Sequence, residues 1–488
     1  MDRSFLKHAA TYGLANVLVQ AGGFFLLPIY LRCLTPADYG VLEIAGRLAE
    51  TAAALLLLGG FRQGAVHVLP AGRRRDRPPP RRGQRLRSSS PPDLAGGAAA
   101  AALTPWLSGG DLPPLALHLA VVGILLEPFS LLPLTLIQAR VESGTYVVVV
   151  VAQFLVRVGL CILLVRGLRW GVPGALAATA ITGVVFGLGL SARELARGIA
   201  WPSVSHLRAM VAFALPLLPS GACFFVLHNG DRFFLRAYST SAEIGTYARG
   251  YKLAMVVRLF SLVPLYMVWS SRMYAAAEGP DAPSLFGRAF TRILAAYLWA
   301  GLGVCLFAPE VIGVLGGAGY AGAAAVVPPI VLACGLQAAT TLMDAAFFLR
   351  RRTNVKLMVT AAATAVMLVL YAALIPPLGT AGAAVATLGG FAFLAPATYL
   401  ATQRIFPVRY EWRRLALLCG LTAALGAAGW PLPAWGWAVA AKAALLLAAP
   451  VLAWHANLVA ADEKGYLNDL RRLALSRLRR RGAEGSVA

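Results

Sequence analysis

Long apolar stretches alternate with short polar segments along almost the whole chain. The runs 357–375 and 415–429 are among the clearest, and each has about the length of a helix that crosses the hydrocarbon core of a bilayer. The pattern predicts about fourteen membrane-spanning helices. Twelve are expected near residues 8–31, 41–66, 94–109, 115–138, 144–166, 172–193, 209–236, 246–270, 289–313, 324–349, 355–375 and 380–402. The last two are expected near residues 414–431 and 436–458.

Two sequence markers recur at nearly the same spacing, which indicates an internal repeat. Residues Tyr30–Leu42 return about 205 positions later as Phe234–Tyr247, and Trp170–Thr179 return about 208 positions later as Leu378–Thr387. Each copy holds six predicted helices. Because six is an even number, both copies start from the same side of the membrane and are parallel repeats, an arrangement found in transporters.

The predicted fold class is therefore an all-α polytopic membrane protein, built from two parallel six-helix lobes and two further C-terminal helices. We place the N-terminal lobe in residues 1–200 and the C-terminal lobe in residues 201–405. The two extra helices fall in residues 406–460, and a basic cytoplasmic tail follows in 461–488.

Composition and charge agree with a membrane protein. The chain is 59% hydrophobic and only 13% charged, against about 25% charged residues in an average soluble protein. Lys and Arg gather in loops on one side of the predicted helices, whereas loops such as 376–379 and 431–435 on the other side carry almost no charge. The positive-inside rule then places both termini in the cytoplasm. Basic loops facing anionic lipid also explain the net charge of +23, so no nucleic-acid partner is expected.

One segment of the first lobe departs from the pattern. Residues 70–97 are rich in Pro, Arg, Ser and Gly, and the predicted helix 94–109 is short and consists mainly of Ala and Gly. Two interpretations stay open for 70–97, namely a genuine basic loop or a stretch of the gene read out of frame.

Ionisable residues inside predicted helices are the best candidates for a binding site, because a charge in a bilayer is costly and usually faces a cavity or a partner. Arg47 and Lys252 hold equivalent positions in the two repeats, so we expect them to bind an anion between the lobes. The further candidates for this cationic cavity are Arg62, Arg232, Arg249 and Arg258.

Ion pairs are the alternative for some of these residues. Glu43 lies one helical turn from Arg47, and Asp231 precedes Arg232, whereas no acidic residue lies near Lys252 or Arg258 in the sequence.

A second candidate group comprises Asp231, Glu127 and Arg157, which could couple transport to an ion or serve as structural partners. Glu127 and Arg157 are expected to pair between helices near mid-membrane, with proton or sodium coupling at Glu127 as the alternative. Lys442, in the last helix, is expected to extend its amine to the outer interface.

Catalytic chemistry is not indicated. The chain has no Walker A loop and none of the usual hydrolase motifs, and its six cysteines are scattered without a CxxC pair. We therefore expect no enzymatic activity, no metal site and no cofactor.

Three motifs resemble those of a known family. They are Leu34–Gly40, Asp231–Leu235 with the following Glu243–Tyr247, and Trp170–Ala175. The chain resembles the Wzx-type O-antigen and exopolysaccharide flippases, polysaccharide biosynthesis proteins of the multidrug/oligosaccharidyl-lipid/polysaccharide (MOP) superfamily. The resemblance extends over nearly the whole chain apart from residues 66–112.

This resemblance implies a multi-pass protein of the bacterial inner membrane that translocates undecaprenyl-diphosphate-linked oligosaccharide by alternating access of its two lobes. Its expected partners are that glycolipid, membrane lipid, and the polysaccharide polymerase and chain-length proteins. The alternatives are a drug or cation antiporter of the multidrug and toxic compound extrusion (MATE) type, a membrane enzyme of polysaccharide assembly, and a scaffold of the same machinery.

Overall fold

The structure is a computed structural model of the chain. It describes residues 26, 30, 33–55, 114–139, 142–197, 218–316, 322–456 and 458. Most of the predicted helix 8–31, all of the predicted helix 94–109, the segment 70–97 and the tail from 461 lie outside the described residues.

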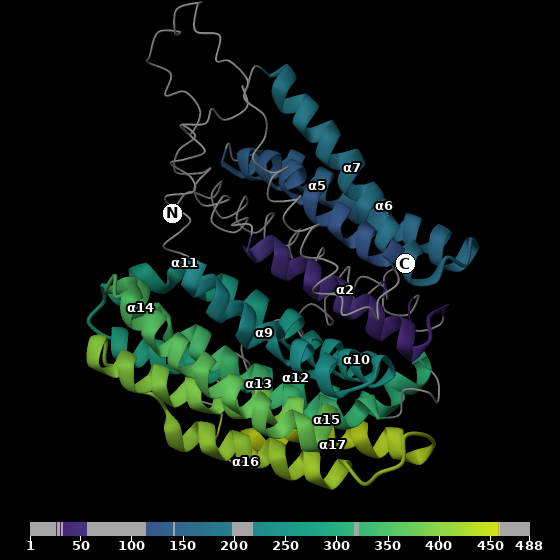
Figure 1. The fold of residues 1–488 in the computed structure, drawn as a ribbon. Coiled ribbons are helices and arrows are strands. Elements are labelled where there is room, and N and C mark those ends of the chain that lie inside the picture. The colour runs from purple at the N-terminus through teal and green to yellow at the C-terminus, as the bar shows by residue number, and fades with distance from the viewer. Residues whose placement is uncertain are drawn as a thin grey trace, which may run out of the picture.

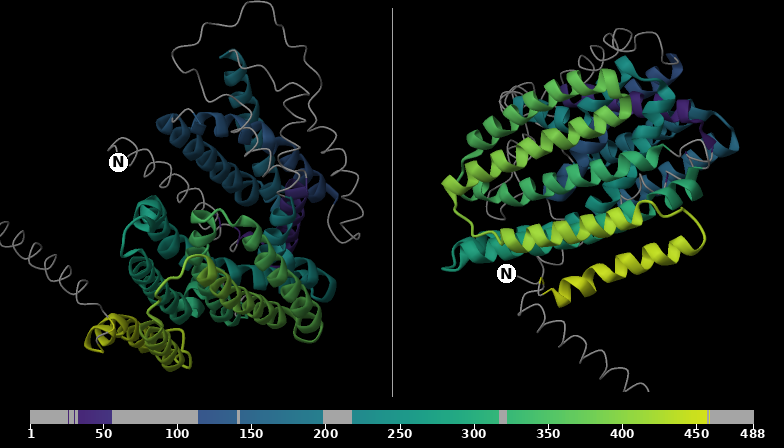
Figure 2. Two further views of the ribbon diagram at one scale, coloured as in Figure 1. Left: turned by 90° about the vertical axis from the view of Figure 1, so that its left-hand side faces the viewer. Right: turned by 90° about the horizontal axis from the view of Figure 1, so that it is seen from below.

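The described helices lie in two groups (Figure 1). The first comprises α2 (Pro36–Leu55), α5 (Pro114–Ala139), α6 (Ser143–Cys161) with its π-helical continuation η1 (Ile162–Gly167), and α7 (Gly171–Ala196). The second comprises α9 (Leu218–Tyr238), α10 (Ser241–Val257), the π-helical η3 (Arg258–Leu262), α11 (Val263–Ala277), α12 (Ala282–Gly316), α13 (Ala323–Met343), α14 (Ala345–Leu349) and α15 (Thr353–Ile405). Helices α16 (Trp412–Gly429) and α17 (Trp437–His455) lie along the outside of this second group (Figures 1 and 2).

Many of these helices are membrane spans by their length and composition. Seven helical segments of the described chain are long and apolar enough to cross a bilayer: Gly144–Gly167, Gly171–Glu194, Ser241–Ser270, Ala282–Val314, Ala323–Leu349, Thr353–Ile405 and Trp437–His455. The structure thus confirms the prediction of an all-α polytopic membrane protein.

The first repeat marker forms a helix cap in each copy. Thr35 precedes α2, where its hydroxyl accepts the Asp38 backbone N–H at 3.1 Å and the Asp38 carboxylate accepts the Thr35 N–H at 3.1 Å. Thr240 and Glu243 make the same reciprocal pair at the start of α10. Such caps satisfy backbone donors that a helix leaves open at its N-terminus. Both helices therefore begin about five residues before the predicted starts at 41 and 246, which were set by the apolar run alone.

The second repeat marker forms the same turn twice. Gly171 opens α7 with φ of +58°, and Gly379 interrupts α15 with φ of +55° and ψ of −129°. These left-handed values favour glycine because it has no Cβ. The break at Gly379 divides the long α15 near the boundary predicted between helices 355–375 and 380–402.

A glycine three residues further on completes each turn. A Cβ on Gly382 would lie 2.0 Å from the Leu374 carbonyl oxygen, and one on Gly174 would lie 3.2 Å from the Leu164 carbonyl oxygen. Both turns therefore combine a positive-φ glycine with a second glycine three residues further on that lies near a backbone carbonyl, and the approach is closer in the second copy.

Candidate functional site

Helices α2 and α10, which are equivalent in the repeat, cross in direct backbone contact. A Cβ on Gly40 would lie 1.8 Å from the Ser241 carbonyl oxygen, and a Cβ on Gly245 would lie 2.0 Å from the Pro36 carbonyl oxygen. Gly40 and Gly245 are equivalent in the repeat, and so are Pro36 and Ser241. The contact is therefore reciprocal, as expected at a local two-fold axis between the two copies.

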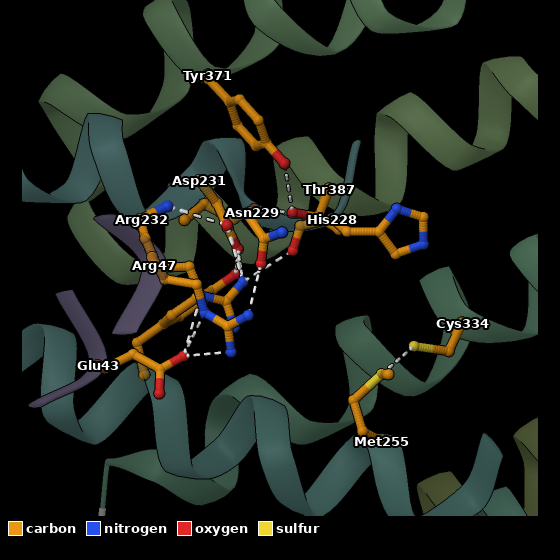
Figure 3. A network of polar contacts seen from close by, with 12 residues as sticks. Glu43, Arg47, His228, Asn229, Asp231, Arg232, Met255, Cys334, Tyr371 and Thr387 are labelled. Carbon is orange, nitrogen blue, oxygen red and sulfur yellow. Dashed lines mark hydrogen bonds and ion pairs between the residues drawn. The ribbon is translucent and has the colours of Figure 1, made fainter. Parts of the chain in front are cut away.

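Glu43 lies one turn beyond this crossing, where it is 5% exposed and contacts cations from both repeats. Its Oε1 accepts Nε and Nη2 of Arg47 at 3.0 and 2.9 Å, and its Oε2 lies 3.2 Å from Nζ of Lys252 (Figure 3 shows the Arg47 contacts). Arg232 Nε lies 3.7 Å from the same carboxylate. One buried carboxylate thus holds the charged ends of side chains from α2, α9 and α10.

Tyr39 supports the Lys252 side of this cluster. Nζ of Lys252 donates to the Tyr39 hydroxyl at 2.7 Å, and the tyrosine itself is completely buried. The guanidinium of Arg249 lies over the Tyr39 ring, 4.8 Å from its centroid, and is 2% exposed. Cation–π contacts of this kind stabilise a desolvated guanidinium, so the tyrosine ring of α2 orders two basic residues of α10.

Asp231 and Arg232 form the second half of the cluster on α9. Nη1 of Arg232 donates to both carboxylate oxygens of Asp231 at 2.8 and 2.7 Å, and the Tyr247 hydroxyl donates to Asp231 at 2.5 Å (Figure 3 shows the Arg232 contacts). The Arg232 guanidinium also lies 3.9 Å from the ring centroid of Tyr251. Both charged side chains are about 2% exposed, which favours the pairing interpretation over an open cavity position.

Asn229 of α9 also contacts the first half of the cluster, because its Oδ1 accepts Nη1 of Arg47 at 2.8 Å (Figure 3). We refer to Tyr39, Glu43, Arg47, Asn229, Asp231, Arg232, Arg249 and Lys252 as the inter-repeat cluster.

Basic residues outnumber acidic ones within the inter-repeat cluster. It holds four cations and two carboxylates, which gives a formal excess of two positive charges. The side chains of Lys252 and Arg47 are 36% and 22% exposed, whereas that of Glu43 is 5% exposed. Lys252 and Arg47 are therefore the members through which the cluster can contact a ligand.

Two sequence expectations about ion pairs need correction. Lys252 does have an acidic neighbour, Glu43, which lies in the other repeat and so could not be recognised from proximity in the chain. Lys442 does not extend to the membrane interface, because its Nζ pairs with Oε1 of Glu310 at 2.6 Å and its side chain is only 2% exposed. This buried pair joins α17 to α12.

Of the remaining candidates, the described residues Arg258 and Arg157 are not members of the inter-repeat cluster. Arg258 begins the π-helical η3, a departure from α-helical geometry of the kind often found at functional positions. Arg157 is exposed on α6. Arg62 and the side chain of Glu127 lie outside the described residues, so the Glu127–Arg157 pair stays a prediction. Among the described residues there is no group of three potential metal ligands.

Sequence reasoning missed Tyr39 and Asn229 as members of the site. Tyr39 lies within the first repeat marker, whose recurrence was the available signal, but its role depends on the distant Lys252 and Arg249. Asn229 is a polar residue two positions before Asp231 in the predicted helix 209–236, and polar residues in membrane helices commonly bind a partner.

Several solved structures of membrane transporters have a similar fold. A structure of the lipid II flippase MurJ in an inward closed conformation matches with a TM-score of 0.67 and 9% identity, over 92% of this chain and 99% of that chain. An inward-facing multidrug resistance MATE transporter of the MOP superfamily matches with a TM-score of 0.56 and 16% identity, over 82% of this chain and 96% of that one. A mutant MATE protein gives a TM-score of 0.52 and 17% identity, over 85% and 97% of the two chains. At these identities the likeness concerns the fold alone.

The sequence comparison adds a match to one family model over about a third of the chain. Residues 98–270, which include α10 and all three residues of the second candidate group, match the family model described as polysaccharide biosynthesis protein. None of the curated protein sequences matches the chain. The family match and the shared fold agree with the predicted resemblance to polysaccharide biosynthesis proteins.

Proposed function

We propose that this protein translocates undecaprenyl-diphosphate-linked glycan units from the cytoplasmic to the outer leaflet of the bacterial inner membrane, as a transporter rather than an enzyme. Both termini would then be cytoplasmic, and residues 1–200 and 201–405 would form the two lobes. The inter-repeat cluster is the observation that carries the proposal, because it places an excess of positive charge where the repeats meet.

The diphosphate is the part of this substrate that the cluster fits best. Arg47 presents a planar guanidinium and Lys252 an ammonium, and charge-assisted hydrogen bonds from both would hold the anionic oxygens. Glu43 acts as an internal counter-charge that keeps the two side chains in place while the substrate is absent. The excess positive charge favours an anionic headgroup over the cationic substrates of a drug antiporter.

The crossing of α2 and α10 supports movement by alternating access. In the proposed topology these two helices begin at the outer face of the membrane, so the contact of Gly40 with Ser241 and of Gly245 with Pro36 closes that face. Opening toward the outside would require the two lobes to separate at this contact and close on the cytoplasmic side. Rocking of parallel repeats around a central site has this form.

Reconstitution tests the proposal directly. Purified protein in liposomes, given a fluorescent undecaprenyl-diphosphate sugar, should move the label from one leaflet to the other. Arg47→Ala and Lys252→Ala, made separately, each leave Glu43 with the other of these two cations and with Arg232, so the fold is expected to persist while flipping falls about tenfold, the effect of losing a charge-assisted contact.

A matched control is Arg404→Gln, which removes an exposed basic residue in the last turn of α15 and should flip normally. Equal rates for Arg47→Ala, Lys252→Ala and the control would show that the inter-repeat cluster does not bind the headgroup. Absence of any flipping by the unmodified protein, with correct folding, would instead favour a scaffold.

A further inference from the structure

A long apolar groove lies between α16 and the second helix group, away from the inter-repeat cluster. Its volume is about 870 Å³, and its walls come from α12, α13, the second half of α15 and α16, for example at Tyr297, Val331, Tyr399 and Ala423. None of its described lining residues comes from α2, α9 or α10, which carry the cluster. The groove is therefore separate from the proposed path of the transported headgroup.

The groove has the chemistry and length of a binding site for lipid chains. Trp412 and Trp430 both line it and stand at opposite ends of α16, about 27 Å apart at the rise of an α-helix. This length is close to the thickness of the hydrocarbon core of about 30 Å. Thr422, one of the few polar lining residues, already donates its hydroxyl to the Leu418 carbonyl at 2.9 Å. Water would find few hydrogen-bond partners there, so an apolar chain is the suitable occupant.

A polar cavity adjoins the groove at one end. This cavity, of about 630 Å³, shares Trp412 with the groove and is also lined by Tyr410, Glu411, Arg413 and Arg414. Arg414 is held by Glu411 at 3.1 Å and by a contact with the Leu458 carbonyl, whereas Arg413 is exposed. Two arginines and one glutamate leave this end positively charged. By the distribution of Lys and Arg it is also the cytoplasmic end of the groove.

We propose that the groove and this cavity together bind one anionic phospholipid from the cytoplasmic leaflet, with its acyl chains in the groove and its phosphate at Arg413 and Arg414. Basic pockets between helices on the cytoplasmic side are suited to anionic headgroups, and this pocket shares Trp412 with the apolar groove. The bound lipid fills the space between α16 and α12, α13 and α15 and thereby attaches the C-terminal helix pair to the lobe. This site is independent of the proposed flippase function.

Native mass spectrometry of the purified full-length protein tests the proposal. The delipidated protein is titrated with phosphatidylglycerol and with phosphatidylcholine of the same acyl chains, and one phosphatidylglycerol should be retained preferentially. Arg413→Gln should weaken phosphatidylglycerol binding about fivefold, the effect expected of one basic residue at a membrane surface. Arg404→Gln, outside the lining of both cavities, should leave it unchanged.

The apolar half of the site has its own matched pair of variants. Ala423→Phe places a ring in the groove and should reduce retention of both lipids, whereas Ala424→Phe adds the same bulk at an exposed neighbour outside the lining and should not. If Ala423→Phe does not fold, Ala427→Leu tests the same surface more mildly. Equal retention of the two lipids, an unaffected Arg413→Gln, or displacement of phosphatidylglycerol by undecaprenyl phosphate at equal concentration would each overturn the assignment.

Discussion

The carboxylate of Glu43 and the ammonium of Lys252 lie 3.2 Å apart although they belong to different copies of the internal repeat and are distant in the chain. Arg47, the repeat equivalent of Lys252, binds the other oxygen of the same carboxylate. The two copies therefore differ at this site. Each supplies a cation at the equivalent position, Arg47 or Lys252, but only the first copy has a carboxylate at the position of Glu43. Ala248 stands at the position of Glu43 in the second copy.

Replacing Glu43 should therefore destabilise the protein. Glu43→Gln keeps the shape of the side chain but leaves Arg47, Lys252 and the buried Arg232 without their shared anion. Breaking a buried ion pair in this way costs about 3–5 kcal/mol, and the thermal unfolding temperature of the purified protein should fall accordingly. Glu411→Gln, at a half-exposed pair with Arg414, should cost less than about 1 kcal/mol. Equal unfolding temperatures for the two variants would contradict the central role assigned to Glu43.

Enlarging either glycine of the α2–α10 crossing should force the two helices apart. Gly40→Ala and Gly245→Ala place a methyl group 1.8 and 2.0 Å, respectively, from a backbone carbonyl oxygen of the opposite helix, which a rigid helix cannot accommodate without moving. Overpacking of this kind costs about 1–3 kcal/mol, measured as a lower unfolding temperature. Gly46→Ala on the same α2 is the control, since its new Cβ would meet nothing within 4 Å. The transport rates of the two variants test whether this crossing closes the outer face. Equal rates for Gly40→Ala and Gly46→Ala would contradict that role.

The repeated turn glycines should respond alike to substitution. Gly171→Ala and Gly379→Ala each place a Cβ on a residue with positive φ, and such a sparsely populated backbone conformation costs about 1–3 kcal/mol in a residue other than glycine. Because both glycines have nearly the same positive φ, both variants should lose unfolding free energy of this order. Chemical denaturation of the two purified variants measures both. If only one of the two variants loses stability, the two glycines do not contribute equally to stability although they are equivalent in the sequence repeat.

The buried pair of Glu310 and Lys442 offers a double-mutant cycle. Lys442→Met alone leaves the Glu310 carboxylate buried without its cation and should cost about 3–5 kcal/mol. Combining it with Glu310→Leu removes both charges, and buried ion pairs replaced in this way are often no less stable than the original. The double variant should therefore recover most of the lost unfolding temperature. Additive losses would mean that the two side chains do not depend on each other.

Several features could be predicted from the sequence because they depend on local order. The apolar runs predicted the helices, since a bilayer requires about twenty apolar residues in succession. The recurrence of Thr35–Gly40 as Thr240–Gly245 predicted equivalent elements in the two copies. The caps, however, showed that α2 and α10 begin at Pro36 and Ser241, because polar residues that satisfy the first backbone donors continue the helix beyond its apolar part.

Partners of the charged residues depended on tertiary structure. Nothing near Lys252 or Lys442 in the sequence points to Glu43 or Glu310, because each pair joins helices that meet only when the chain packs. By itself, the sequence determined a duplicated membrane protein with basic residues inside its helices. Only the tertiary structure decided that one glutamate, beside a glycine crossing of α2 and α10, gathers those charges from both repeats. The physical reason is that a buried charge requires a partner at hydrogen-bond distance, and distances between helices are set by packing rather than by order along the chain.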